Sequence, residues 1–258
     1  MHSFIRPLIL PGCEATYSRK EMAAEGYAQL QAGKQKSHWI YQPRQKCSGV
    51  VVYFHGNAET ADQWCELGKW LKSRFDWKIV LVEYPGYGLS KAAIPDSENE
   101  LFAMGSRVIE AVRESRTLAQ KPLVVWGRSL GGALAANLAS SSTVDGVLLD
   151  STMADAATGW SVPPALIRML NRQFAFESAE ALTTSACPVL VSHSRSDEVF
   201  DWDHAERLAE AATGPSKLIE VKGDHGAEKY TQRRFVDGLR CLLEAATHFH
   251  AARATMNC

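Results

Sequence analysis

Short apolar runs, rich in branched and aromatic side chains, recur along the chain between stretches in which apolar residues follow helical spacing. Such runs predict buried strands of a parallel sheet, and the stretches between them predict helices that pack on it. The predicted strands are residues 36–43, 49–54, 78–84, 122–126, 144–150, 187–193 and 217–221. The predicted helices are residues 59–75, 98–118, 130–140, 203–212 and 228–249. Residues 26–31 are expected to form a hairpin with the first of these strands.

The alternation of strand and helix predicts an α/β fold with a mostly parallel central sheet and helices on both faces. The length of 258 residues fits one large domain covering residues 1–258. The composition, 46% hydrophobic and 22% charged, is that of a globular protein, and the net charge of −1 gives no sign of a nucleic-acid partner. Because ligands of such sheets bind at the carboxyl ends of the strands, the residues that follow each strand are the candidates for chemistry.

The cysteine pattern and the terminal segments predict a cytoplasmic protein that holds no metal or cofactor. The six cysteines form no C-x-x-C pair and no zinc-finger spacing with histidine; they are Cys13, Cys47, Cys65, Cys187, Cys241 and Cys258. We expect reduced thiols, while a disulfide between Cys13 and Cys47 stays open. The amino-terminal segment lacks a signal-peptide core, and no apolar run is long enough to span a membrane. The sequence leaves the oligomeric state open.

The stretch VVWGRSLGGA, residues 124–133, sets a serine between two glycines at the point where a strand gives way to a helix. This context predicts a nucleophile elbow, in which a sharp turn exposes the Ser129 hydroxyl above the sheet. In such a turn the residues two before and two after the serine must lack bulk, and this requirement explains Gly127 and Gly131. Arg128, beside the serine, is predicted to be a structural residue of the elbow.

A serine nucleophile in acyl transfer needs two N–H donors for the oxyanion that its attack creates. One is predicted to be the backbone N–H of Leu130, the residue after the serine. The other is predicted in the loop after strand 49–54, which reads His55-Gly56-Asn57, at the backbone of Asn57. His55 is interpreted as a residue that orders this loop.

An acid and a base for the serine are predicted after the last two strands. Asp197 follows strand 187–193 and is expected to orient the histidine and stabilise its charged form. His225, which follows strand 217–221 in the sequence GDHG, is the predicted general base. Other acids stay open as alternatives to Asp197: Glu198, Asp201, Asp203 and Asp150.

Over residues 36–250 the sequence resembles the α/β-hydrolase superfamily. Four segments together resemble the subfamily of Bem46-type hydrolases and protein depalmitoylases: YFHGNAE (53–59), EYPGYGLS (83–90), GRSLGG (127–132) and LLDST (148–152). The resemblance implies the α/β-hydrolase fold with a short cap, and a Ser-Asp-His triad in the chain order Ser129, Asp197, His225. It also implies a serine hydrolase that acts on small-molecule esters or thioesters without a cofactor. Tyr84 and Tyr87 are expected near the active site.

The usual place for a cap or lid in this fold is residues 151–186, between the predicted strands 144–150 and 187–193. Its apolar side chains fit either ordinary packing or a wall for an acyl chain: Trp160, Val162, Leu166, Ile167, Met169, Leu170 and Phe174. The triad also leaves open an amidase, a carbon–carbon bond hydrolase or an acyltransferase, and a non-catalytic binding protein stays a further alternative. Dehalogenase and epoxide hydrolase activities are disfavoured because they need a carboxylate where Ser129 stands.

Overall fold

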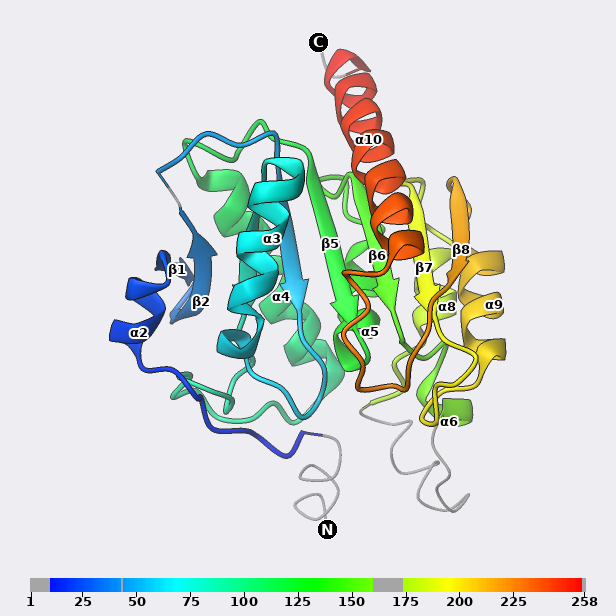
Figure 1. Cartoon of the computed structure of the whole chain (residues 1–258), viewed down its shortest axis with the longest axis horizontal. Coiled ribbons are helices and arrows are strands. Elements are labelled where there is room, and N and C mark those ends of the chain that lie inside the picture. The colour runs from blue at the N-terminus through cyan, green and yellow to red at the C-terminus, as the bar shows by residue number, and fades with distance from the viewer. Residues whose placement is uncertain (1–9, 43, 160–173, 257–258) are drawn as a thin grey trace. The chain divides into compact units, whose positions relative to one another are not determined.

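The computed structural model describes residues 10–42, 44–159 and 174–256 (Figure 1). The chain divides into two compact units, Met1–Lys121 and Pro122–Cys258, each with its own strands and helices. Strands alternate with helices in both units, so the α/β class predicted from the sequence is confirmed.

The described residues of the first unit form four strands in the order β1-β2-β4-β3. They are β1 (Tyr27–Ala32), β2 (Gln35–Tyr41), β3 (Gly49–Phe54) and β4 (Trp77–Val82). β1 and β2 form the predicted hairpin, β2 pairs antiparallel with β4, and β3 pairs parallel with β4. Every residue of β3 and β4 is buried, as their apolar runs predict.

In the described part of the first unit, the helices are α2 (Arg19–Ala24), the 3-10 helix η2 (Ala61–Trp64), α3 (Cys65–Phe75) and α4 (Glu98–Glu114). α3 packs on β4, and α4 packs on β1. Gly68 allows the close approach of α3, since a Cβ there would lie 2.0 Å from the Tyr27 hydroxyl oxygen. The predicted helix 98–118 ends early, at Glu114, where Ser115 leaves the helical conformation.

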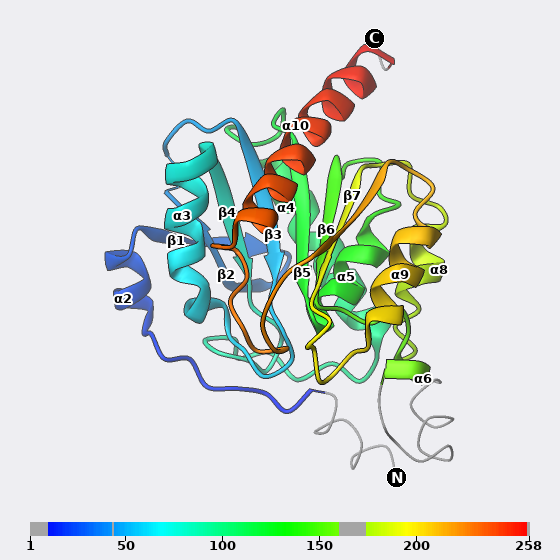
Figure 2. The same ribbon diagram turned by 45° about the vertical axis from the view of Figure 1, so that its right-hand side comes forward.

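The second unit holds four parallel strands in the order β5-β6-β7-β8. They are β5 (Leu123–Arg128), β6 (Gly146–Asp150), β7 (Val189–His193) and β8 (Ser216–Glu220). Figures 1 and 2 show α10 (Arg233–Met256) on one face of these strands. The opposite face carries α5 (Leu130–Leu138), α8 (Ser178–Leu182) and α9 (Trp202–Ala211). Because the four strands are parallel, their carboxyl ends lie at the same edge of this part of the sheet.

The helix α10 is anchored near its end by a buried aspartate. Asp145 lies just before β6, and one of its carboxylate oxygens accepts a hydrogen bond of 2.8 Å from the Leu123 N–H. His250 Nδ1 lies 3.1 Å from that oxygen, and Arg253 Nη2 lies 2.9 Å from the other. These contacts hold the last turns of the helix, which continues to Met256, beyond the predicted end at residue 249.

The segment predicted as a cap, residues 151–186, is described only in part. It contains α6 (Ala156–Gly159) and α8, and residues 160–173 lie outside the described residues. Of the apolar side chains named for the cap, Phe174 is described: it is buried and its ring lies 5.9 Å from that of Phe176. The cap and the single-domain organisation stay predictions.

Five of the six cysteines lie among the described residues. Cys13, Cys47, Cys65, Cys187 and Cys241 are free thiols. In the part of the chain that the structure describes, no helix combines the length and apolar character needed to cross a membrane. Within residues 10–42, 44–159 and 174–256, no group of three His, Cys, Asp or Glu residues is arranged to hold a metal ion.

Candidate active site

Ser129 sits between β5 and α5 in a strained conformation, with φ 51° and ψ −119°. Its N–H donates a hydrogen bond of 2.9 Å to the Asp150 carbonyl, and its carbonyl accepts one of 2.9 Å from Gly132 N–H. A Cβ at Gly127 would lie 2.0 Å from the Gly131 carbonyl oxygen, so only glycine fits there. The strand, sharp turn and helix predicted for this stretch are all present.

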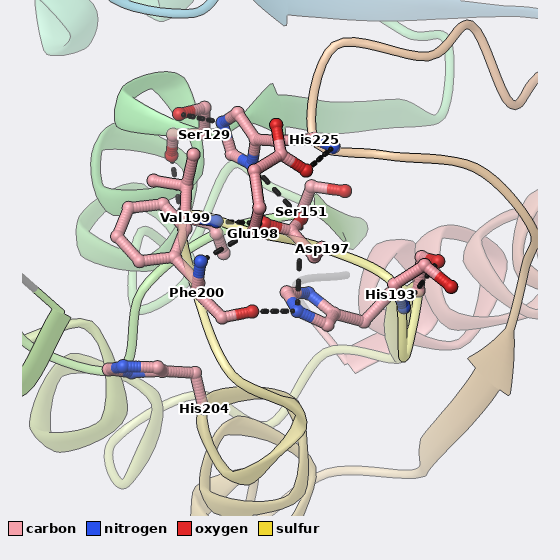
Figure 3. Close-up of polar contacts among 12 residues, drawn as sticks. Ser129, Ser151, His193, Asp197, Glu198, Val199, Phe200, His204 and His225 are labelled. Carbon is pink, nitrogen blue, oxygen red and sulfur yellow. Dashed lines mark hydrogen bonds and ion pairs between the residues drawn. The ribbon is translucent and has the colours of Figure 1, made fainter.

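The structure brings Ser129, His225 and Asp197 into one hydrogen-bond chain (Figure 3). His225 Nε2 lies 2.9 Å from Ser129 Oγ. His225 Nδ1 lies 2.9 and 3.0 Å from the two carboxylate oxygens of Asp197. Each residue follows a different strand of the second unit, namely β5, β7 and β8. At these distances the imidazole can exchange a proton with Ser129 Oγ, and the carboxylate can fix the orientation of the ring.

Asp197 is a buried carboxylate with several hydrogen-bond donors. The N–H groups of Val199 and Phe200 each donate to one of its oxygens at 3.0 Å. Burial acts to raise the pKa of Asp197, but hydrogen bonds from His225 and from the Phe200 N–H outweigh it and lower the pKa to about 2. Asp197 is therefore ionised at neutral pH and holds a negative charge against the imidazole.

The main chain of His225 is held on both sides. Glu198 accepts a hydrogen bond of 2.9 Å from the His225 N–H. Arg128 Nη2 donates a hydrogen bond of 2.6 Å to the His225 carbonyl. The Phe200 ring packs edge-on against the imidazole at 5.4 Å. Arg128 thus makes a structural contact. Its partner lies in the histidine loop, the segment 221–232 that carries His225, and the sequence did not predict this contact.

The alternative acids lie in other positions. Asp150 ends β6 with its carboxylate buried, and that burial raises its pKa. Asp201 precedes α9 as its N-cap, and Asp203 lies in the first turn of that helix. Glu198 contacts the His225 backbone and not its ring. The geometry favours Asp197 as the partner of the imidazole.

The predicted residues of the first unit form a buried network of their own. His55 Nε2 lies 3.1 Å from Glu83 Oε1, and its Nδ1 lies 2.8 Å from the Gly56 carbonyl. The Tyr84 hydroxyl donates to the His55 carbonyl at 2.6 Å, and the Tyr87 hydroxyl donates to Asn57 Oδ1 at 3.0 Å. These contacts fit the interpretation of His55 as a loop-ordering residue. The oxyanion role of Asn57 and the nearness of both tyrosines to the active site stay predictions.

Three buried polar side chains beside Ser129, Asp197 and His225 were not predicted. Thr152 Oγ1 donates a hydrogen bond of 2.5 Å to the Ser129 carbonyl. His193 Nε2 lies 2.8 Å from the Phe200 carbonyl, and Lys229 donates to Ser151 Oγ. The segment LLDST is the signal that could have indicated Thr152, whereas nothing in the sequence distinguishes Lys229 from a surface lysine.

Comparison with known proteins connects this geometry to a family. The family model described as alpha/beta hydrolase fold matches residues 49–175. The uncharacterized protein YfhR of Escherichia coli strain K12 is 28% identical over 195 residues, covering 74% of this chain and 67% of YfhR. Human alpha/beta hydrolase domain-containing protein 17C is 28% identical over 185 residues, or 71% of this chain. The matched region spans only 55% of the human protein's length.

Solved structures share the fold at low sequence identity. An esterase from Thermogutta terrifontis with butyrate bound has a TM-score of 0.63 and 17% identity, covering 90% of this chain and 95% of its own. A monoacylglycerol lipase from Paleococcus ferrophilus has a TM-score of 0.62 and 17% identity, covering 82% of this chain and 98% of its own. A Pyrococcus furiosus esterase has a TM-score of 0.66 and 12% identity, covering 93% and 97%.

The family model and the solved structures define the class by its fold: this chain has the α/β-hydrolase fold. Within that class it resembles the Bem46-type and protein-depalmitoylase-like hydrolases, as its similarity to YfhR and to protein 17C indicates.

Proposed function

We propose that this protein is a serine hydrolase that cleaves carboxylic esters or thioesters through an acyl-enzyme on Ser129. The observation that carries the proposal is the hydrogen-bond chain from Ser129 Oγ through the His225 imidazole to the Asp197 carboxylate. The esterase and lipase with the same fold favour ester substrates.

In the first half of the reaction, His225 Nε2 takes the proton of Ser129 Oγ as that oxygen attacks the acyl carbon. Asp197 stabilises the imidazolium that forms, and its low pKa keeps it ionised throughout. The tetrahedral intermediate then breaks its bond to the leaving alcohol or thiol, which receives the proton from His225. Ser129 is left as an acyl ester.

In the second half, His225 takes a proton from water, and the resulting hydroxide attacks the acyl-enzyme. Collapse of the second intermediate releases the carboxylic acid and returns the proton to Ser129. Each oxyanion needs N–H donors. Leu130 is the first residue of α5, where N–H groups have no partner within the helix, so its N–H can serve as one donor. Asn57 supplies the second donor in this proposal.

Replacing Ser129 with alanine tests the mechanism directly. The hydrolysis of p-nitrophenyl esters from acetate to palmitate is measured for the wild type and Ser129→Ala. We expect the variant to lose at least about a thousandfold in kcat, because it has no nucleophile. The exposed Ser140, just beyond α5, provides the matched control, and Ser140→Ala should retain full activity. Comparable turnover by Ser129→Ala and the wild type would refute the mechanism.

A further inference from the structure

The segment Asp150-Ser151-Thr152, which begins at the last residue of β6, holds both main-chain polar groups of Ser129. The Asp150 carbonyl accepts the Ser129 N–H at 2.9 Å, and Thr152 Oγ1 donates to the Ser129 carbonyl at 2.5 Å. Thr152 is 1% exposed, so water does not compete for this contact. A residue with φ of 51° keeps such a conformation only where its surroundings hold it firmly.

A glycine in α5 makes room for Thr152. A Cβ at Gly132 would lie 2.2 Å from Thr152 Oγ1 and 2.3 Å from Thr152 Cβ. Gly132 is not among the glycines with positive φ, so its backbone does not require glycine. The absence of a side chain at Gly132 therefore serves the approach of Thr152 to the Ser129 carbonyl.

The middle residue of the segment connects to the elements that carry the acid and the base. The Ser151 N–H donates to the Ser192 carbonyl of β7 at 2.9 Å. Ser151 Oγ accepts a hydrogen bond from Lys229, which is 2% exposed and lies in the loop of His225 (Figure 3 shows Ser151 beside Asp197). The positive charge of Lys229 also acts on the buried Asp150 carboxylate. The segment 150–152 thus contacts the backbone of Ser129, the strand β7 that precedes Asp197, and the loop that carries His225.

We propose that Thr152 is a positioning residue that holds the strained backbone of Ser129 so that its Oγ stays within hydrogen-bond distance of His225. Asp150 and Ser151 complete the clamp by fixing the Ser129 N–H and, through Lys229, the histidine loop. This inference rests on the proposed function of Ser129. Loss of the Thr152 hydroxyl lets the serine backbone relax and moves Oγ away from the base.

The matched pair Thr152→Val and Thr152→Ser tests the role of the hydroxyl. Valine keeps the shape of threonine without the donor, whereas serine keeps the donor. We measure the rate at which a fluorophosphonate labels Ser129, together with kcat and KM for p-nitrophenyl butyrate, each normalised to the folded fraction. Thr152→Val should lose at least about tenfold in labelling rate and in kcat, because small misplacements of a reacting group have large effects, while KM changes less than about twofold. Thr152→Ser should retain most of both rates.

A second variant keeps the test decisive if Thr152→Val folds poorly. Gly132→Ala retains the Thr152 hydroxyl but displaces it from the Ser129 carbonyl, and alanine is favourable in a helix. It should slow labelling and turnover to a similar extent as Thr152→Val. Wild-type rates in folded Thr152→Val or Gly132→Ala would overturn the clamp while leaving the proposed function intact. A wild type that neither reacts with the fluorophosphonate nor cleaves esters would overturn the proposed function and this inference with it.

Discussion

At the scale of single residues, the side chains that adjoin Ser129 and Asp197 in the sequence hold the backbone of His225. Arg128 immediately precedes Ser129, and Glu198 immediately follows Asp197. The Arg128 side chain donates to the His225 carbonyl, and the Glu198 side chain accepts from the His225 N–H. The turns that contain Ser129 and Asp197 therefore also position the His225 imidazole.

Removing the guanidinium of Arg128 should weaken this positioning. Arg128→Met loses the 2.6 Å hydrogen bond to the His225 carbonyl, and we expect kcat for ester hydrolysis to fall about tenfold. Arg128→Lys, which keeps a charged donor, should fall less. Steady-state kinetics on folded protein measure the effect. The control is Arg195→Met, whose side chain is 59% exposed and pairs with Glu220. A kcat for Arg128→Met equal to that of the control would contradict this role.

The sequence predicted the residues of the hydrogen-bond chain but not those that hold them. Ser129 and His225 could be found because each follows an apolar strand within a glycine-containing turn. Thr152 and Lys229 act through contacts with residues far along the chain. The segment LLDST contains Thr152 but does not reveal its contact, and no local pattern marks Lys229. Among several acids after β7, only the three-dimensional arrangement distinguishes Asp197 from Glu198.

At the scale of elements, the boundaries of α10 depend on contacts outside the helix. Residues 228–249 were predicted as helical, but the helix begins at Arg233. Just before it, the Gln232 side chain bonds both the N–H and the carbonyl of Lys222, which closes the histidine loop. α2 was missed because only Met22 of that helix is buried, although its capping box of Ser18 and Glu21 is visible in the sequence.

The anchor of α10 on Asp145 should contribute to stability. Arg253→Met leaves the buried Asp145 carboxylate with one charged partner fewer, and we expect a loss of about 1–2 kcal/mol in the free energy of unfolding. Arg233→Met on the same helix is the control, because the Arg233 side chain is 95% exposed and should change stability by less than about 0.5 kcal/mol. Urea denaturation of both variants measures the difference. Equal losses would argue against the anchor.

At the scale of the whole molecule, the types of the long elements could be predicted while their spatial order could not. All seven predicted strands and the hairpin partner of the first are present. The place of β4 between β2 and β3 was not predicted, because it depends on pairings between distant segments. The apolar composition of a fully buried strand reveals the strand itself but not which strands will pair with it.

The acid stability of the whole molecule should depend on Asp197. Its pKa falls from the ordinary 3.8 to about 2 on folding, so its contribution is complete above about pH 4 and is lost as the pH falls toward 2. The shift corresponds to about 2 kcal/mol. Asp197→Asn lacks this contribution. Urea denaturation of both proteins from pH 5 to pH 2 should therefore show their difference in unfolding free energy shrinking by about that amount. A difference independent of pH would contradict the prediction.

The strand order of the second unit has a consequence for synthesis. β8 is the last strand in the order, pairs with β7, and leads directly to His225. Ser129 and His225 are 96 positions apart. A chain emerging from the ribosome exposes the serine well before the histidine exists, and domains form as their segments emerge. Under the proposed mechanism, the nascent protein therefore carries Ser129 without its base until β8 has paired with β7.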